Sequence, residues 1–237
     1  ELPATDMKRG CYASMFSGCN LTQAPKLPAL NLAPSCYEYM FSRNKMLTQA
    51  PELPATELAD SCYDGMFLRC EKLVQAPILL ATKLKPHCYS SMFEGCISLT
   101  QAPELIATEL APFCYCRMFH SCTGLTEAPE LPDTKELVSD SYRFMFSYCS
   151  NLNTIKVHFK AWVEDNYSGY CWVNDVSPTG TFYCPRELPI EYGIARIPKG
   201  WNVVYIDDTV AVEVNYLTFT AEEDGSSFGI VNNGDNN

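Results

Sequence analysis

The residues best suited to chemistry lie in one short stretch, 114–122, which holds three cysteines and a histidine. Cys116 and His120 are four residues apart, so on a helix they would share a face and could together bind zinc. A structural zinc site needs four ligands, however, and Cys114 and Cys122 belong to a repeated pattern that we expect to face the core. Only two ligands then remain on the outer face. We therefore predict no metal site.

Catalytic groups are not indicated elsewhere in the chain. The three histidines, His87, His120 and His158, are scattered along the sequence. No serine or cysteine stands in a nucleophile elbow, and there is no glycine-rich loop for phosphate. The paired acids Glu222 and Glu223 fall in a turn-rich tail, where they are expected to be solvated. We predict that the protein is not an enzyme and needs no cofactor.

Thirteen cysteines would be typical of a small disulfide-linked domain, but here most of them recur with a repeat. Cys62 and Cys70 are eight residues apart, about 12 Å along a helix, which is too far for a disulfide. We expect the recurrent cysteines to be free thiols that pack as small hydrophobes. Cys171 and Cys184 lie outside the repeat. They could pair or stay free, and we favour free thiols.

The chain is acidic, and its charged residues are unevenly distributed along the sequence. The formal net charge is −11, and after Lys199 there are seven acidic residues and no Lys or Arg. No basic cluster for nucleic acid or anionic lipid is present, so neither partner is expected. No apolar run approaches the roughly 18–20 residues of a membrane span. The chain opens within a repeat and without a signal peptide, so we interpret it as a mature or excised fragment.

The elements that must position these residues repeat along the chain. A Met-Phe pair recurs at intervals of 25 to 27 residues, and a fixed period in this range is typical of a solenoid. The six pairs begin at Met15, Met40, Met66, Met92, Met118 and Met145. A Cys-Tyr pair precedes most of them, and a further cysteine follows. Asn44 replaces the following cysteine in the second copy, and Ser141 replaces the leading cysteine in the sixth.

Each copy divides into a predicted helix and a predicted strand. The apolar residues of 114–122 follow the i, i+1, i+4, i+5, i+8 spacing of a helix with one buried stripe. Residues 99–102 are predicted to be a short strand, stopped by Pro103 because proline cannot donate to a sheet ladder. We predict an α/β solenoid, a curved leucine-rich-repeat array. It should curve because strands stack about 4.8 Å apart whereas helices need about 8–10 Å.

The period ends before the chain does. We assign residues 1–159 to the repeat array of about six copies and 160–206 to an aromatic-rich C-terminal cap. Residues 207–237 contain alternating apolar positions and a polar tail. They are predicted to be a β-strand segment of a following module.

The concave face should carry the strand side chains that point away from the core. In one register these are Thr22, Thr48, Val74, Thr100 and Thr126, and in the other they are Gln23, Gln49, Gln75, Gln101 and Glu127. A glutamine column could present its amides to a protein or glycan. Alternatively, its members could hydrogen-bond one another, as amide ladders do in stacked sheets.

A neighbouring position varies between copies. It holds Lys26, Glu52, Ile78, Glu104 and Glu130. A binding surface on a fixed scaffold would vary in this way, although a solvated surface without a role would vary too. The candidate binding residues are therefore the glutamine column with Glu127, together with Glu52, Ile78, Glu104 and Glu130. The recurrent tyrosines are predicted to be packing residues, not a sugar-binding column.

The repeated motif Cys-Tyr-x-x-Met-Phe-x-x-Cys-x-x-Leu-Thr-x-Ala-Pro-x-Leu-Pro-Ala-Thr-x-Leu is clearest at 62–84 and 88–110. It resembles the BspA-type leucine-rich repeat of surface proteins from gut and oral Bacteroidales. Residues 180–185 and 197–204 are similar to the ending that such arrays carry. Leu80 and Ile106 depart from the motif, which has proline at that position.

This resemblance implies an extracellular location, on the bacterial outer cell surface, and an adhesin-like role. We therefore expect a non-enzymatic binding module that recognises a host or neighbouring-cell protein or glycan through the concave face. The alternative is a passive stalk or spacer that presents another module. The identity of the ligand, the anchoring mode and the oligomeric state do not follow from the sequence.

Overall fold

The computed structural model describes residues 2, 4–134, 137–162 and 169–206. Within these residues the regular elements are three short parallel strands, and no α-helix is present. The strands are β1 (Thr154–Lys156), β2 (Thr181–Cys184) and β3 (Asn202–Tyr205). They form one sheet in the order β1-β2-β3, in which Thr181 pairs with both Thr154 and Asn202.

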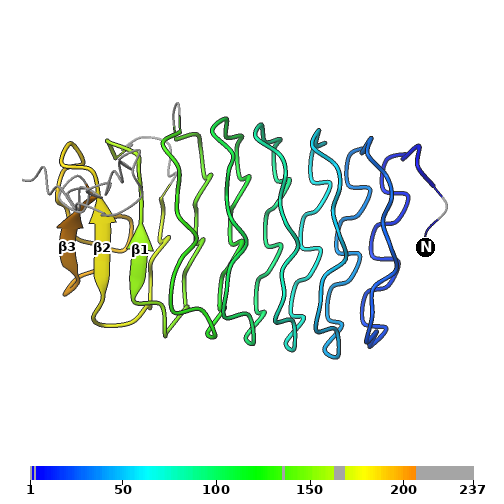
Figure 1. The fold of residues 1–237 in the computed structure, drawn as a ribbon, viewed down its shortest axis with the longest axis horizontal. Coiled ribbons are helices and arrows are strands. Elements are labelled where there is room, and N and C mark those ends of the chain that lie inside the picture. Colours follow the sequence, from blue (N-terminus) through cyan, green and yellow to red (C-terminus); the bar gives the residue numbers. More distant parts are fainter. Residues whose placement is uncertain (1, 3, 135–136, 163–168, 207–237) are drawn as a thin grey trace, which may run out of the picture.

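Successive copies of the repeat form coils that lie side by side in a row, with the N-terminal copy at one end and the sheet at the other (Figure 1). Parallel bridges join equivalent residues of adjacent coils. These bridges are Asp6–Asn31, Asn31–Glu57, Gln49–Gln75, Lys83–Glu109, Glu127–Thr154 and Leu131–Val157. The strands of the sheet therefore continue a pairing that runs through the earlier copies.

The predicted helices are not formed. In their place the structure has turn ribbons, which we define as residues 8–19, 33–44, 59–70, 85–96, 111–122 and 138–149. In these ribbons, alternate N–H groups donate to the carbonyl three residues earlier, as Cys62 donates to Ala59 at 3.2 Å. The intervening N–H groups donate to the next copy, as Tyr63 donates to Cys88 at 3.1 Å.

A left-handed backbone conformation at every fourth residue prevents a helix from forming. In the third ribbon the residues with positive φ are Ser61 (53°), Gly65 (57°) and Arg69 (56°), and the other ribbons repeat the pattern. For L-residues this conformation costs about 1–2 kcal/mol each. The cost is offset because the left-handed conformation turns every second N–H group toward a carbonyl of the neighbouring copy.

The ribbons are therefore spaced by backbone hydrogen bonds, as strands are. Five such bonds, 2.7–3.1 Å long, join each of the five pairs of adjacent ribbons. We predicted a curved array because helices need wider spacing than strands. That reason does not apply here, because backbone hydrogen bonds set the spacing on both sides of each coil. In the view of Figure 1 the row of coils runs nearly straight.

The core consists of columns of identical side chains. Adjacent tyrosine rings lie 5.9–6.1 Å apart and adjacent phenylalanine rings 5.7–5.9 Å apart, with their planes within 11° of parallel. Met66, Phe67 and Leu73 in the third copy are fully buried, and so are their counterparts in the next copies. These stacks show that the tyrosine column is packing, as predicted.

Buried thiols add a second hydrogen-bond ladder along the row. The Sγ atom of Cys70 lies 3.1 Å from the Phe41 carbonyl of the preceding copy, and Cys96, Cys122 and Cys149 make the equivalent contacts. Asn44 takes the cysteine position in the second copy. Its Nδ2 donates to Phe16 O at 2.7 Å, and its Oδ1 accepts from Leu21 N at 2.8 Å. Asparagine thus serves the same carbonyl as the thiol it replaces.

In the described part of 160–206, large aromatic rings lie over the last copy. Trp172 is 1% exposed, packs 6.1 Å from Phe146, and donates from Nε1 to Arg196 O at 2.9 Å. Phe182 of β2 is also fully buried beside Trp172. These contacts are consistent with the predicted capping of the array by 160–206. The predicted β segment 207–237 lies outside the described residues.

The ribbon conformation is testable at two interior glycines. A Cβ atom at Gly65 (φ +57°) would lie 2.1 Å from Tyr39 Cε1, whereas the nearest atom to one at Gly95 (φ +73°) would be Cγ of the flexible Arg69 side chain, at 3.1 Å. We expect Gly95→Ala to lower the unfolding free energy by about 1 kcal/mol from backbone strain alone. Gly65→Ala should cost about 2–4 kcal/mol, because the Tyr39 ring must also move. Equal losses in urea unfolding would contradict this packing.

Candidate functional site

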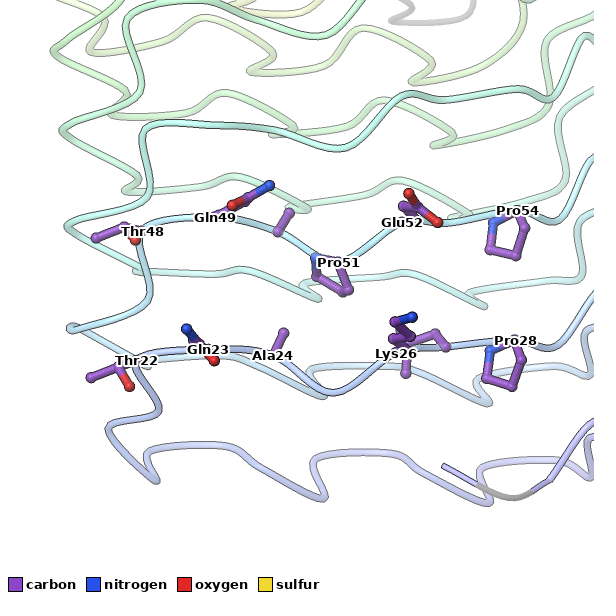
Figure 2. Close-up of a pocket in the computed structure, with 12 residues that line it drawn as sticks. Thr22, Gln23, Ala24, Lys26, Pro28, Thr48, Gln49, Pro51, Glu52 and Pro54 are labelled. Carbon is purple, nitrogen blue, oxygen red and sulfur yellow. The ribbon is translucent and has the colours of Figure 1, made fainter. Parts of the chain in front are cut away.

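The candidate binding residues all lie at the surface. The glutamine column, Glu127, and the variable residues Glu52, Ile78, Glu104 and Glu130 are exposed. The threonine column and Val74 are exposed as well, so the two predicted registers do not exclude each other. Figure 2 shows Thr22 and Thr48 at the corner of the coil, with Gln23 and Gln49 next to them on the same segment.

A bend in the backbone explains why two successive side chains point outward. The N–H groups of Val74 and Gln75 both donate to the Thr48 carbonyl, at 2.9 and 3.3 Å. Asn153 and Thr154 share the Thr126 carbonyl in the same way. Two residues opposite one form a bulge, which interrupts the strict alternation of a strand.

The glutamine side chains do not form an amide ladder. Among the described residues, no side-chain hydrogen bond joins Gln23, Gln49, Gln75 or Gln101 to the next glutamine. Their amide groups face solvent. The purely structural explanation of this column therefore has no support from its contacts.

In the described part of the chain, two grooves on this face are lined by candidate residues. The first, of about 560 Å³, is lined by Gln23, Gln49 and Glu52 among the candidates, together with Lys26 and several prolines (Figure 2). The second, of about 510 Å³, is lined by Glu104 and Glu130 among the candidates, together with Ile106, Asp133, His158 and several prolines. The remaining candidates, Gln75, Ile78, Gln101 and Glu127, line neither groove.

The acidic side chains of the face differ in how far they are neutralised. The Glu130 carboxylate contacts His158 Nε2 and lies 3.0 Å from Lys156 Nζ. These two partners lower the pKa of Glu130. Within the described residues, no ion pair engages Glu52 or Glu104. Their carboxylates remain open to a cationic partner.

Sequence reasoning missed a group of exposed aliphatic residues on the same face. Ile78 is 76% exposed, Val74 54%, Ile106 43% and Leu80 42%. Of these only Ile78 was a predicted site residue. The signal was present, because Leu80 and Ile106 stand where the repeat motif has proline, and Val74 stands where most copies have threonine.

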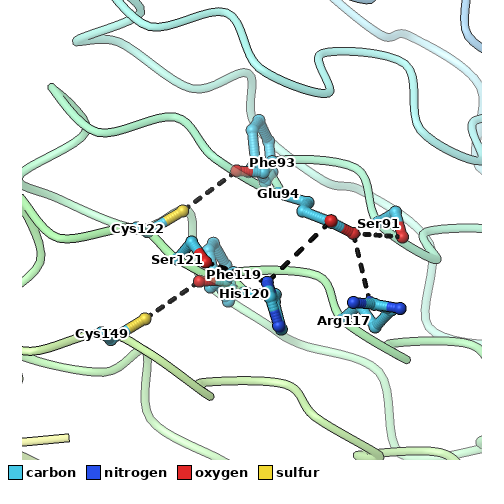
Figure 3. A network of polar contacts seen from close by, with 9 residues as sticks. All are labelled: Ser91, Phe93, Glu94, Arg117, Phe119, His120, Ser121, Cys122 and Cys149. Carbon is cyan, nitrogen blue, oxygen red and sulfur yellow. Dashed lines mark hydrogen bonds and ion pairs between the residues drawn. The ribbon is translucent and has the colours of Figure 1, made fainter. Parts of the chain in front are cut away.

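The ribbon side carries a separate polar network, shown in Figure 3. Glu94 Oε2 accepts from Ser91 at 3.0 Å and lies 3.3 Å from Arg117 Nε, while Glu94 Oε1 is 3.9 Å from His120 Nδ1. Burial lowers the pKa of His120, which favours the neutral imidazole. Cys116 is buried nearby. Among the described residues, no three His, Cys, Asp or Glu side chains form a group that could hold a metal ion.

A buried carboxyl group lies in the same ribbon region. Burial, together with the nearby Glu38, raises the pKa of Asp64 to about 7. Its Oδ1 atom is buried and has no hydrogen-bond partner among the described residues. A carboxylate at this place is therefore costly once the pH exceeds its native pKa.

The chain matches no protein-family model, and neither the curated proteins nor the solved structures include a significant match. None of the described segments forms a helix that could cross a lipid bilayer.

The raised pKa of Asp64 predicts that the stability of the fold depends on pH. Because its native pKa lies above that of the unfolded chain, the unfolded state releases the proton first, and stability falls between about pH 4 and pH 7. We expect Asp64→Asn to remove this fall and to raise stability at pH 8 by up to about 4 kcal/mol. Thermal unfolding at pH 5 and pH 8 measures it. The exposed Asp60→Asn is the control, and an equal response of both variants would contradict the prediction.

The thiols predict a pattern of reactivity. All thirteen cysteines are free, but ten are buried, Cys171 is half-buried, and only Cys11 and Cys19 are exposed. Burial raises the pKa of Cys62 to about 12, so this thiol holds almost no thiolate at neutral pH. We expect a thiol reagent to modify Cys11 and Cys19 rapidly in the native protein and the ten buried thiols only after unfolding. Rapid reaction that persists in a Cys11→Ser, Cys19→Ser variant would refute this.

Proposed function

We propose that the chain is a non-enzymatic binding module of the leucine-rich-repeat type, secreted or displayed on a bacterial cell surface. It recognises a protein or glycan of a host or neighbouring cell through the face that carries the glutamine column and the variable position. The resemblance of the repeat motif supports the location and the class.

One observation carries this proposal. From the second copy onward, the recurrent tyrosine, methionine, phenylalanine and leucine side chains are buried. The position that changes between lysine, glutamate and isoleucine is exposed, on the face that carries the recurrent glutamines and two grooves. A frame held by identical columns can accept substitutions at the exposed positions without loss of packing. A constant buried frame with a variable exposed surface suits recognition better than catalysis.

The chemistry of the face also favours recognition. It offers free amides at Gln23 and Gln49, one cation at Lys26, and carboxylates at Glu52 and Glu104. Such groups orient a ligand by hydrogen bonds and charge. No nucleophile and base are set together among them.

The test is capture of ligands from an array of extracellular-matrix proteins and glycans by the purified chain. We expect at least one ligand to bind, and Gln49→Ala with Glu52→Ala to weaken its binding about tenfold, equivalent to about 1.4 kcal/mol. The control is Lys85→Ala. Lys85 is exposed at the start of the turn ribbon 85–96, away from the binding face, and its replacement should change affinity less than twofold. No capture by the array, or equal loss in the control, would favour the passive stalk instead.

A further inference from the structure

Three of the exposed aliphatic residues form one patch on the binding face, which we define as Ile78, Leu80 and Ile106. Ile78 and Leu80 belong to one segment, with Leu79 buried between them, so both point to the same outer side. Ile106 is the equivalent of Leu80 in the next copy. The hydrogen bond from Thr108 N to Thr82 O keeps these two segments in register.

The patch is confined to the middle of the row. In the copies on either side, the position of Ile78 holds Glu52 and Glu104, and the position of Leu80 holds Pro54 and Pro132 apart from Ile106 itself. The position of Ile78 therefore changes from charged to aliphatic to acidic along the row. Such a local concentration of exposed aliphatic side chains is typical of a contact surface for a partner.

Carboxylates border the patch on both sides. Glu52 precedes Ile78 in its column, and Glu104 and Glu130 follow it. Lys156 and His158 partly neutralise Glu130, but among the described residues no ion pair engages Glu52 or Glu104. Charge complementarity therefore calls for a cation on each side of an apolar group.

The apolar surface suits a protein better than a sugar. A sugar ring is often stacked on an exposed aromatic ring, but the tyrosine and phenylalanine columns of the middle copies are buried. Ile78, Leu80 and Ile106 offer aliphatic contact only. A groove of about 510 Å³, lined by Ile106 and Glu104, lies directly beside them and has room for a long cationic side chain.

We propose that the occupant of this patch is a segment of a partner protein in which an aliphatic side chain is flanked by lysine or arginine, an inference that rests on the proposed function. The aliphatic side chain covers Ile78, Leu80 and Ile106. The flanking cations lie against Glu52 and Glu104. The remaining polar part of the face, toward Gln23 and Lys26, extends the contact.

The probe is a nine-residue glycine–serine peptide that carries Lys-Leu-Lys at its centre. Two matched peptides replace the leucine by serine or both lysines by glutamate. Each is titrated into the full chain, and methyl NMR signals are followed. We expect Lys-Leu-Lys to shift the methyl signals of Ile78, Leu80 and Ile106, and each matched peptide to bind about tenfold more weakly. The exposed Ile190 of the C-terminal region is the internal control and should not shift.

Variants separate the two contributions. Ile78→Ser should weaken binding of the Lys-Leu-Lys peptide about tenfold, whereas Ile190→Ser should not change it, and both side chains are exposed enough for the fold to persist. Glu52→Gln with Glu104→Gln should weaken binding severalfold and reduce its salt dependence. Glu57→Gln, an exposed change at a different position of the repeat, is the control.

Several outcomes would overturn the inference. Equal binding of the serine peptide would mean mere attraction to an acidic protein, and shifts at Ile190 would mean unspecific apolar contact. If the array yields a ligand that depends on Gln49 and Glu52 but not on Ile78, or yields only a glycan, this inference fails while the proposed function stands. If neither array nor peptide binds, both fail.

Discussion

The structure depends on how the N–H groups of each turn ribbon are divided between two partners. In an α-helix every interior donor is satisfied within the element, so the helix can be complete before it packs. Here only alternate donors bond within the copy, and the others need the carbonyls of the next copy, as Tyr63 needs Cys88. Because an unpaired buried N–H group is costly, no copy can complete its backbone alone. The copies depend on one another through hydrogen bonds as well as through apolar burial.

This backbone spacing determines the core. It holds equivalent residues of adjacent copies close enough for each ring to stack on its own counterpart, about 6 Å away. The same spacing places each buried thiol beside a carbonyl of the preceding copy, as with Cys96 and Phe67. Each column needs a side chain of similar shape in every copy, and the thiol column also needs a hydrogen-bond donor for the carbonyl of the preceding copy. Asn44 satisfies the need with an amide, and Trp172 ends the phenylalanine column with a larger ring.

A frame built in this way leaves exposed positions of each coil free to vary. The exposed positions contribute little to the stacking, so they can carry lysine, glutamate or isoleucine at the same place in different copies. The result is a face whose chemistry changes along the row: the variable position holds lysine or glutamate in the first two copies, isoleucine in the third, and glutamate in the next two. Asp64 is the exception on the ribbon side, where a buried carboxyl group is held at some cost to stability.

The sequence by itself determined the repeat, its period and its buried columns, because stacked copies require the same side chain at the same place. Tyr63, Met66, Phe67 and Cys70 were all expected inside and are all buried. It did not distinguish a helix from a turn ribbon, since side chains four residues apart share a side in both. A strict four-residue spacing drifts by about 40° per step around an α-helix, and this was the available hint. The tertiary structure decided the ribbon, the near-straight row, the exposure of both threonine and glutamine columns, and the grouping of Ile78 with Leu80 and Ile106. Each of these depends on where the hydrogen-bonding groups and side chains of the adjacent copy lie, and that is a property of the assembled row, not of any single copy.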